Sequence, residues 1–256
     1  MFNKIQHASL SELPTAGKHT GTSARRLPVW LRRTAPVAPD IEIWQAQLDP
    51  GPEAVSQCSA LLSPDERLRA SRFHFERDRR RFIVARATLR ILVGKSLDVA
   101  PADIAFGYTE SGKPFVEKPA EGIHFNISHS EDCALYALSA VRALGVDIEC
   151  VERKIDHHSI ARRFFTRNEW STLQQLPDSI MKRVFFSVWT RKEAIAKAMG
   201  SGLALPFDQF EVTTDADARP RILQLAPEMG DIADWSLHLV ESDPHYVAAV
   251  AAYRQL

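Results

Sequence analysis

The 256-residue chain has few cysteines, no surplus of charge and no long apolar run. Its three cysteines, Cys58, Cys133 and Cys150, have no metal-type spacing, and an odd number argues against a disulfide framework, so we expect a reducing, cytoplasmic location. No apolar run reaches the roughly 18 residues of a membrane span, and the N-terminus lacks the apolar core of a secretory signal. These absences predict a soluble protein without a membrane partner.

Charge is balanced over the whole chain, with 32 basic and 32 acidic residues. This balance disfavours nucleic acid as a partner. The distribution is uneven, because nine arginines face four acids between Asp65 and Arg90. Such a cluster either attracts phosphates or solvates a long helix, and the sequence leaves both interpretations open.

The order of the chain predicts an α+β fold, with mostly antiparallel strands packed by a few long helices. Residues 1–40 are rich in Pro, Gly, Ser and Thr with a basic excess, which predicts a flexible leader outside the fold. A helix start at Ser63-Pro-Asp-Glu66 should open a long Arg-rich helix, broken near 76–78, that runs towards Gly94. Further helices are expected at 159–165, 167–176 and 184–199, and strands at 41–48, 103–108, 123–127, 134–139, 144–150, 207–213, 235–241 and 246–253.

Two carboxylates occupy one face of the expected strand 144–150. Alternation puts Asp147 and Glu149 on one side, while Val146 and Ile148 face the core. Two such carboxylates repel each other unless a cation lies between them, and oxygen ligands suit Mg²⁺. The alternative is a solvated strand face.

A glutamate and a lysine lie four residues apart on the expected helix 184–199. Glu193 and Lys197 are either a surface pair, worth about 0.2–0.5 kcal/mol in an isolated helix, or functional groups. As functional groups, Glu193 would be a third metal ligand or a base, and Lys197 a phosphate contact.

Six motifs in one order carry a resemblance to a known family. They are Ser63-Pro through Arg72-Phe73, Ser111-Gly-Lys-Pro114, Phe125-Asn-Ile-Ser-His-Ser130, Gly145-Val-Asp-Ile-Glu149, Arg163-Phe-Phe-Thr166 with Glu169-Trp170, and Trp189 to Lys197 followed by Gly200-Ser-Gly-Leu203. Over residues 41–253 the chain resembles the Sfp-type 4′-phosphopantetheinyl transferases. Glu66 departs from the pattern, since some relatives have a lysine there, beside the nucleotide.

The resemblance implies a pseudo-dimeric monomer of two similar α/β halves, with CoA and Mg²⁺ in the cleft between them. Residues 41–139 would form the half with the nucleotide contacts, and residues 140–256 the half with the metal-binding and catalytic residues. The implied reaction transfers the 4′-phosphopantetheine arm of CoA, the substrate, to a serine of an apo acyl or peptidyl carrier protein, releasing adenosine 3′,5′-bisphosphate. This modification activates fatty-acid, polyketide or nonribosomal-peptide synthesis. A non-catalytic CoA- or phosphate-binding module is the alternative.

The resemblance also implies roles for individual residues. Asp147, Glu149 and Glu193 would hold the metal, with Glu193 the first choice for general base and Glu149 the second. Lys197 would contact the pyrophosphate. The remaining implied CoA contacts are His129 and Ser128 at the phosphates, Asn126 bracing their loop, and Arg69 and Lys113 at the 3′-phosphate and adenine end.

Several points stay open at this stage. The sequence names neither the carrier protein nor the pathway, and it does not decide between Mg²⁺ and Mn²⁺, between the two candidate bases, or on the acceptance of acylated CoA. A carrier protein is usually a small acidic helical bundle, so its docking surface should be basic or apolar and lie near the mouth of the cleft. The candidate residues are Arg162, Arg163, Arg167 and Lys182.

Overall fold

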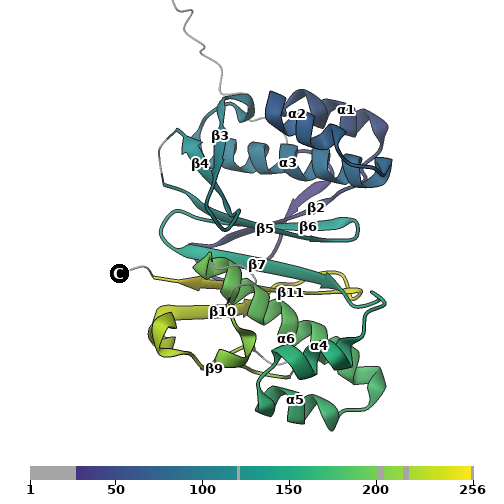
Figure 1. The fold of residues 1–256 in the computed structure, drawn as a ribbon. Helices are drawn as coiled ribbons and strands as arrows, with labels where there is room; N and C mark the ends of the chain where they lie inside the picture. Colours follow the sequence, from purple (N-terminus) through teal and green to yellow (C-terminus); the bar gives the residue numbers. More distant parts are fainter. Residues whose placement is uncertain (1–26, 120–121, 201–204, 216–218, 255–256) are drawn as a thin grey trace, which may run out of the picture.

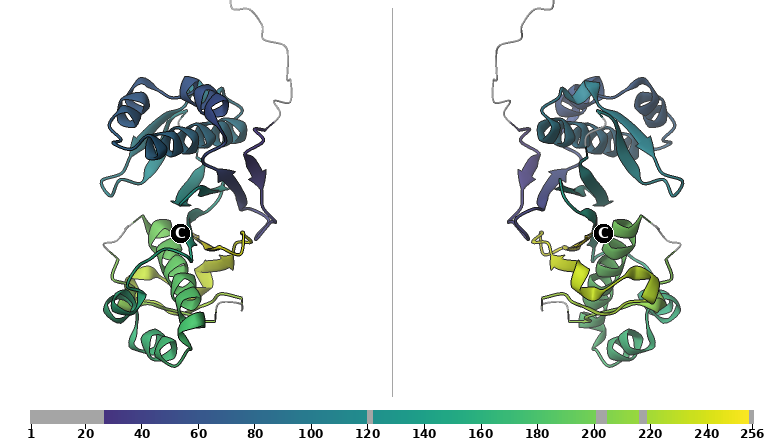
Figure 2. Two further views of the ribbon diagram at one scale, coloured as in Figure 1. Left: turned by 90° about the vertical axis from the view of Figure 1, so that its right-hand side faces the viewer. Right: turned by 90° about the vertical axis from the view of Figure 1, so that its left-hand side faces the viewer.

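Two helix-on-sheet units are stacked with their sheets facing each other (Figure 1). The computed structural model describes residues 27–119, 122–200, 205–215 and 219–254. The helices lie on the outer side of each sheet, so the layers run helix, sheet, sheet, helix (Figures 1 and 2). All strand pairs are antiparallel, which confirms the predicted α+β fold.

The first unit contains a four-stranded sheet in the order β1-β2-β6-β5. The long helix α3 packs on this sheet, and the tyrosine hydroxyl of Tyr136 in β6 donates to the carbonyl of Ala85 in α3 at 2.9 Å. The elements are β1 (Leu31–Arg33), β2 (Glu42–Gln47), α1 (Pro52–Ala60), α2 (Pro64–Ser71), α3 (Glu76–Leu97), β3 (Ala105–Tyr108), β4 (Pro114–Lys118), β5 (His124–Ser130) and β6 (Cys133–Ser139), with a 3₁₀ turn at Pro101–Asp103.

The second unit contains a three-stranded sheet in the order β10-β11-β7, covered by helix α6. A third apolar core fills the space between the two sheets, with Leu135 from β6 and Val146 and Val250 from the second sheet. The elements are β7 (Ala143–Cys150), α4 (His157–Phe164), α5 (Arg167–Gln174), α6 (Asp178–Met199), β8 (Glu211–Val212), β9 (Ile222–Gln224), β10 (Trp235–Leu239) and β11 (Tyr246–Tyr253), with 3₁₀ turns at Phe207–Gln209, Pro227–Met229 and Ile232–Asp234.

A buried glutamate locks the helices of the first unit together. Glu66 accepts the backbone N–H of Ser63 at 2.9 Å, which caps the start of α2. The same carboxylate pairs with Arg86 at 2.5 Å and Arg90 at 2.7 Å on α3. Arg90 also donates to the carbonyl of Ile104 at 2.9 Å. The acid at position 66 is therefore a structural group that neutralises two buried guanidinium groups.

The second unit repeats this arrangement. Glu169 accepts the backbone N–H of Thr166 at 2.9 Å and pairs with Lys192 of α6, also at 2.9 Å. Lys192 in turn donates to the carbonyls of Phe207 and Phe210, at the 3₁₀ turn that follows α6. In both units a buried carboxylate caps a short helix and pairs with a cation on the long helix, and that cation also binds the carbonyls of a turn. This agrees with the two similar halves that the family resemblance implied.

The expectation that the fold begins at residue 41 was wrong, because residues 27–40 are part of it. β1 pairs with β2, with Leu31 opposite Ala46, and Leu31 is buried in the core under α3. Leu31 is the apolar residue that anchors this short edge strand, while Val29 before it is exposed. The rest of the predicted leader, residues 1–26, lies outside the described residues.

Other differences are local. The helix at 52–60 and the strands at 114–118 and 222–224 were not predicted, and α6 begins at Asp178 rather than near 184. β5 continues to Ser130, so the stretch 128–130 is strand rather than loop. Within the described part of the chain, no helix is both long and apolar enough to cross a membrane.

Candidate active site

Polar side chains of β5 join the two units beside strand β7. Asn126, Ser128 and Ser130 alternate along β5 and face β7. The two strands lie next to each other, but among the described strands the backbone of β7 pairs only with β11. Asn126 Oδ1 accepts the backbone N–H of Val146 at 2.9 Å, and Ser130 Oγ accepts that of Cys150 at 3.0 Å. Side chains therefore take the place of a neighbouring strand along the free edge of β7.

Asp147 lies at the centre of this junction and is only 4 % exposed. Its Oδ1 accepts hydrogen bonds from Ser128 Oγ at 2.7 Å and from Lys197 Nζ at 2.6 Å. Its Oδ2 is buried and has no hydrogen-bond partner among the described residues. Because an unpartnered buried carboxylate oxygen is costly, this atom fits a cation ligand.

Glu149 is the second carboxylate on the same face of β7. Its Oε2 accepts from Ser130 Oγ at 3.0 Å and from Arg153 at 2.5 Å. Burial raises the pKa of Glu149; the hydrogen bond from Arg153 acts against this rise and the charge of Asp147 adds to it. The predicted placement of both carboxylates on one face is thus reproduced.

Glu193 reaches the junction from α6, one turn before Lys197. Burial, together with the charges of Asp147 and Glu149 and against the opposing charge of Lys197, raises the pKa of Glu193 to about 7. No described residue donates a hydrogen bond to Glu193. This carboxylate is therefore available to accept a proton near neutral pH.

Gly145 allows α6 to approach β7 closely. A Cβ atom at this position would lie 2.2 Å from the carbonyl oxygen of Ala194 and 2.4 Å from the backbone nitrogen of Ala198. Both atoms belong to the turn of α6 that carries Lys197. The glycine of the Gly-Val-Asp-Ile-Glu motif thus determines how near Glu193 and Lys197 come to the carboxylates of β7.

The three carboxylates offer the oxygen atoms that a hard cation prefers, but their side chains do not form a complete metal site. Across the described ranges, no three His, Cys, Asp or Glu side chains form a group that could hold a metal ion. Asp147 nevertheless has its unpartnered oxygen. Burial is the main cause that raises the pKa of Glu149 and Glu193, and the charge of Asp147 adds to the rise at both, so the three carboxylates lie within electrostatic range. Oxygen-only ligands of this kind suit Mg²⁺ or Mn²⁺.

A hollow of about 540 Å³, open to solvent, is lined by Ser130 and Arg153, the two residues that hydrogen-bond to Glu149. Arg69 lies over the ring of Phe82 at 5.3 Å on one side of it, and His129 faces it from β5. Burial lowers the pKa of His129, and Lys197 and Arg81 lower it further, so the imidazole is neutral at pH 7. The full lining is Arg69, Phe73, Asp78, Arg81, Phe82, Ala85, His129, Ser130, Glu131 and Arg153.

Lys113 was predicted to share a ligand with Arg69, but it does not line this hollow. Its Nζ donates to the carbonyls of Lys197 at 2.7 Å and Leu144 at 3.3 Å, which ties the β3–β4 hairpin to α6 and β7. Burial lowers the pKa of Lys113 to about 8.

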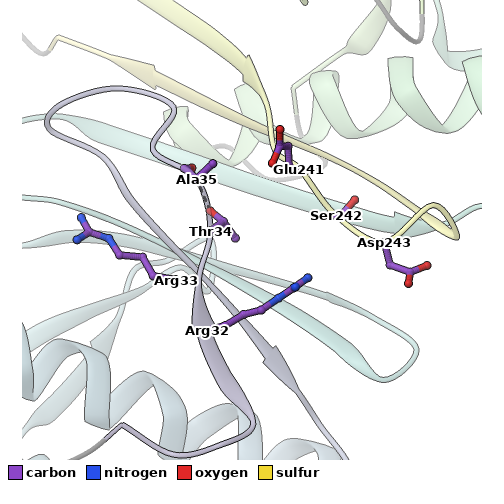
Figure 3. A pocket seen from close by; sticks show the side chains of 7 residues that line it. All are labelled: Arg32, Arg33, Thr34, Ala35, Glu241, Ser242 and Asp243. Carbon is purple, nitrogen blue, oxygen red and sulfur yellow. Dashed lines mark hydrogen bonds between the residues drawn. The ribbon is translucent and has the colours of Figure 1, made fainter.

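A separate hollow of about 310 Å³ lies where β1 passes the chain between β10 and β11 (Figure 3). Arg32 and Arg33 extend in different directions there, and they are engaged with Gln45 at 2.7 Å and Glu42 at 3.1 Å. Its polar groups do not converge on one point, so we assign it no role.

Sequence reasoning did not single out Ser130 and Arg153, which both hydrogen-bond to Glu149. The sequence could have indicated Ser130, since it continues the alternation of polar residues that begins with Asn126 and Ser128. Arg153 has only a four-residue separation from Glu149, and nothing in the sequence shows that the loop after β7 turns it back towards that carboxylate.

Comparison with known proteins gives consistent matches over both units. Residues 143–251 match the family described as the 4′-phosphopantetheinyl transferase superfamily, and residues 46–141 match the one described as 4′-phosphopantetheinyl transferase, N-terminal. The 4′-phosphopantetheinyl transferase HetI of Nostoc sp. is 38 % identical over 83 % of this chain and 87 % of its own length. The 4′-phosphopantetheinyl transferase Sfp of Bacillus subtilis is 31 % identical over 75 % of this chain and 83 % of its own length.

A solved structure also overlaps with part of the chain. A holo-(acyl-carrier-protein) synthase from Bacillus anthracis in complex with CoA (3′,5′-ADP) covers 46 % of this chain and 100 % of its own length, with a TM-score of 0.36 and 22 % identity. A likeness at this level supports no conclusion about this chain.

Proposed function

This chain belongs to the 4′-phosphopantetheinyl transferase superfamily, and we propose that it performs the reaction of that family at the junction of β5, β7 and α6. It is a transferase that moves the 4′-phosphopantetheine arm of CoA to a serine of a carrier protein. The observation that carries the assignment of the site is the buried oxygen of Asp147 without a hydrogen-bond partner among the described residues, in a carboxylate that binds Lys197 at 2.6 Å.

We assign Asp147, Glu149 and Glu193 to a Mg²⁺ ion, with Mn²⁺ as the alternative. A bound divalent cation would bridge phosphate oxygens and offset the charge that develops during transfer. Lys197 is held by Asp147 and Ser128, and its side chain is 25 % exposed, so its ammonium group can also meet a phosphate. Arg69 and His129 line the hollow in which the nucleotide end of CoA would lie.

We assign the general base to Glu193 rather than Glu149. Glu149 already accepts hydrogen bonds from Ser130 and Arg153, and both stabilise its ionised form. Glu193 has no such donor among the described residues, so its carboxylate is the one free to take the serine proton.

The proposed division of labour follows the two halves, residues 41–139 for the nucleotide and residues 140–256 for the metal and the chemistry, with residues 27–40 added to the first. We propose a cytoplasmic monomer, consistent with the three free cysteines, and light scattering at several protein concentrations tests the oligomeric state. The docking surface for the carrier is assigned to the exposed Arg162, Arg163 and Arg167, with the half-buried Lys182 at its edge.

The test is intact-mass spectrometry of an apo acyl carrier protein and an apo peptidyl carrier protein after incubation with this protein, CoA and Mg²⁺. We expect a gain of about 340 Da, one phosphopantetheine arm, on at least one carrier. Chelation of the divalent cation should abolish the gain, and Mn²⁺ should restore it. Transfer that continues in excess chelator would refute the metal assignment but not the transferase.

A further inference from the structure

The two carboxylates of β7 are held in the same way. One oxygen of Asp147 accepts a serine hydroxyl and a cationic side chain, from Ser128 and Lys197. One oxygen of Glu149 likewise accepts a serine hydroxyl and a cationic side chain, from Ser130 and Arg153. In each case the second carboxylate oxygen has no hydrogen-bond partner in the described part of the chain.

We propose that Ser130 and Arg153 are positioning residues that fix the carboxylate of Glu149, so that its free oxygen is presented to a divalent cation. The proposal rests on the proposed function, because it takes Glu149 to be a metal ligand. It extends that function to two residues outside the set Asp147, Glu149, Glu193 and Lys197.

The hydrogen bonds of Ser130 fix the direction of its hydroxyl group. Its Oγ is buried and accepts the backbone N–H of Cys150 at 3.0 Å. A hydroxyl has a single proton to donate, and the acceptor within reach is Glu149 Oε2, also at 3.0 Å. Ser130 therefore donates to Glu149 while its own hydroxyl oxygen is fixed by the backbone of β7.

Arg153 also holds this oxygen. It follows Glu149 by four residues, donates to Oε2 at 2.5 Å, is 41 % exposed and lines the hollow together with Ser130. An arginine is charged at every working pH, and its planar group restricts the carboxylate more than a lysine would. Two donors on one oxygen leave the other oxygen to face a cation.

The test compares Ser130→Ala and Arg153→Gln with two matched controls. Ser139→Ala removes a buried serine hydroxyl of the neighbouring strand, which accepts only from the backbone of Val141 and Arg142. Arg79→Gln removes an arginine that pairs with Glu76 three residues away on the surface of α3. Thermal unfolding of each variant shows whether it is folded before it is assayed.

Two measurements are made on the full-length protein. Electron paramagnetic resonance titration with Mn²⁺ gives the metal affinity without CoA, and steady-state transfer gives kcat and the KM for CoA. Loss of a group that orients a metal ligand commonly costs about 10–100-fold in metal affinity or activity. We expect Ser130→Ala and Arg153→Gln to weaken Mn²⁺ binding within that range and to lower kcat with little change in KM, while Ser130→Thr retains most of the affinity.

The outcomes distinguish the positioning role of Ser130 and Arg153 from the proposed transferase function. Both controls should bind Mn²⁺ as the wild type does. If the two test variants bind Mn²⁺ within twofold of the wild type, or if Ser139→Ala weakens binding as much, the positioning role is refuted. A wild-type protein that binds Mn²⁺ but modifies no carrier would contradict the proposed function alone, whereas one that binds no Mn²⁺ would overturn both.

Discussion

Replacement of Gly145 by alanine tests whether the approach of α6 to β7 builds the site. The added Cβ would lie 2.2 Å from the carbonyl oxygen of Ala194, 2.4 Å from the nitrogen of Ala198 and 2.7 Å from the Cβ of Lys197. Non-bonded heavy atoms normally stay about 3.5 Å apart, so the helix must move by about 1 Å. The clashing atoms are mostly backbone, and no side-chain rotation relieves them.

Two effects follow from such a displacement. Overpacking of this kind costs about 1–3 kcal/mol, and a protein of this size loses about 2–4 °C in Tm per kcal/mol. The contact of 2.6 Å between Lys197 and Asp147 would lengthen, and Glu193 would move with it. A misplacement of about 1 Å among reacting groups can lower the rate about 100-fold.

The assays are thermal unfolding by circular dichroism and the initial rate of carrier modification at saturating CoA. Gly122→Ala is the matched control, because a Cβ at Gly122 meets nothing within 4 Å and its backbone is not left-handed. A Gly145→Ala protein with the Tm and the rate of the wild type would refute the close-approach explanation. A lower rate at an unchanged Tm would show that the substitution changes the alignment of the site and not the stability of the fold.

Three further predictions concern charged residues. Glu193→Gln should lower transfer by about 10²–10⁴-fold while CoA still binds by calorimetry. Because burial raises the folded-state pKa of Glu193 from 4.5 to about 7, the wild type should lose stability as the pH rises from 4.5 to 7, and the Tm of the variant relative to the wild type should rise over that range and then stay level. Unchanged transfer would exclude Glu193 as the base. Glu66→Ala leaves the buried Arg86 and Arg90 unpaired and should lower the free energy of unfolding by about 3–5 kcal/mol in a urea titration, and a change as small as that of a surface variant would contradict this. Arg167→Glu should raise the KM for the carrier and leave the affinity for CoA unchanged, and an equal loss of both would count against a docking role.

Local patterns predicted the elements that carry the chemistry. The alternation around Asp147 and the helical spacing around Glu193 placed both on the correct kinds of element, and the Gly200 stop is observed as a left-handed helix end with φ 75°. These features depend on neighbours within a few residues, and for that reason they can be read from sequence.

Long-range pairing accounts for most of what was missed. Arg86 and Arg90 of α3 pair with Glu66, which lies 20 and 24 residues away, and no local pattern indicates these pairs. Lys113 reaches the end of α6 across the fold, which no local pattern indicates. The polar run at 128–130 suggested a loop. It is a strand, and its serines are polar because they hydrogen-bond to residues of β7 rather than to solvent.

The side chains that cover the free edge of β7 also bear on self-association. A strand with unpaired N–H and C=O groups is a template on which another chain can add a strand. Here Asn126 and Ser130 accept hydrogen bonds from two backbone N–H groups of this edge, and Lys113 donates one to the carbonyl of Leu144. Loss of these side chains would therefore expose a pairing edge in the middle of the molecule, so substitutions here should promote aggregation as well as inactivation.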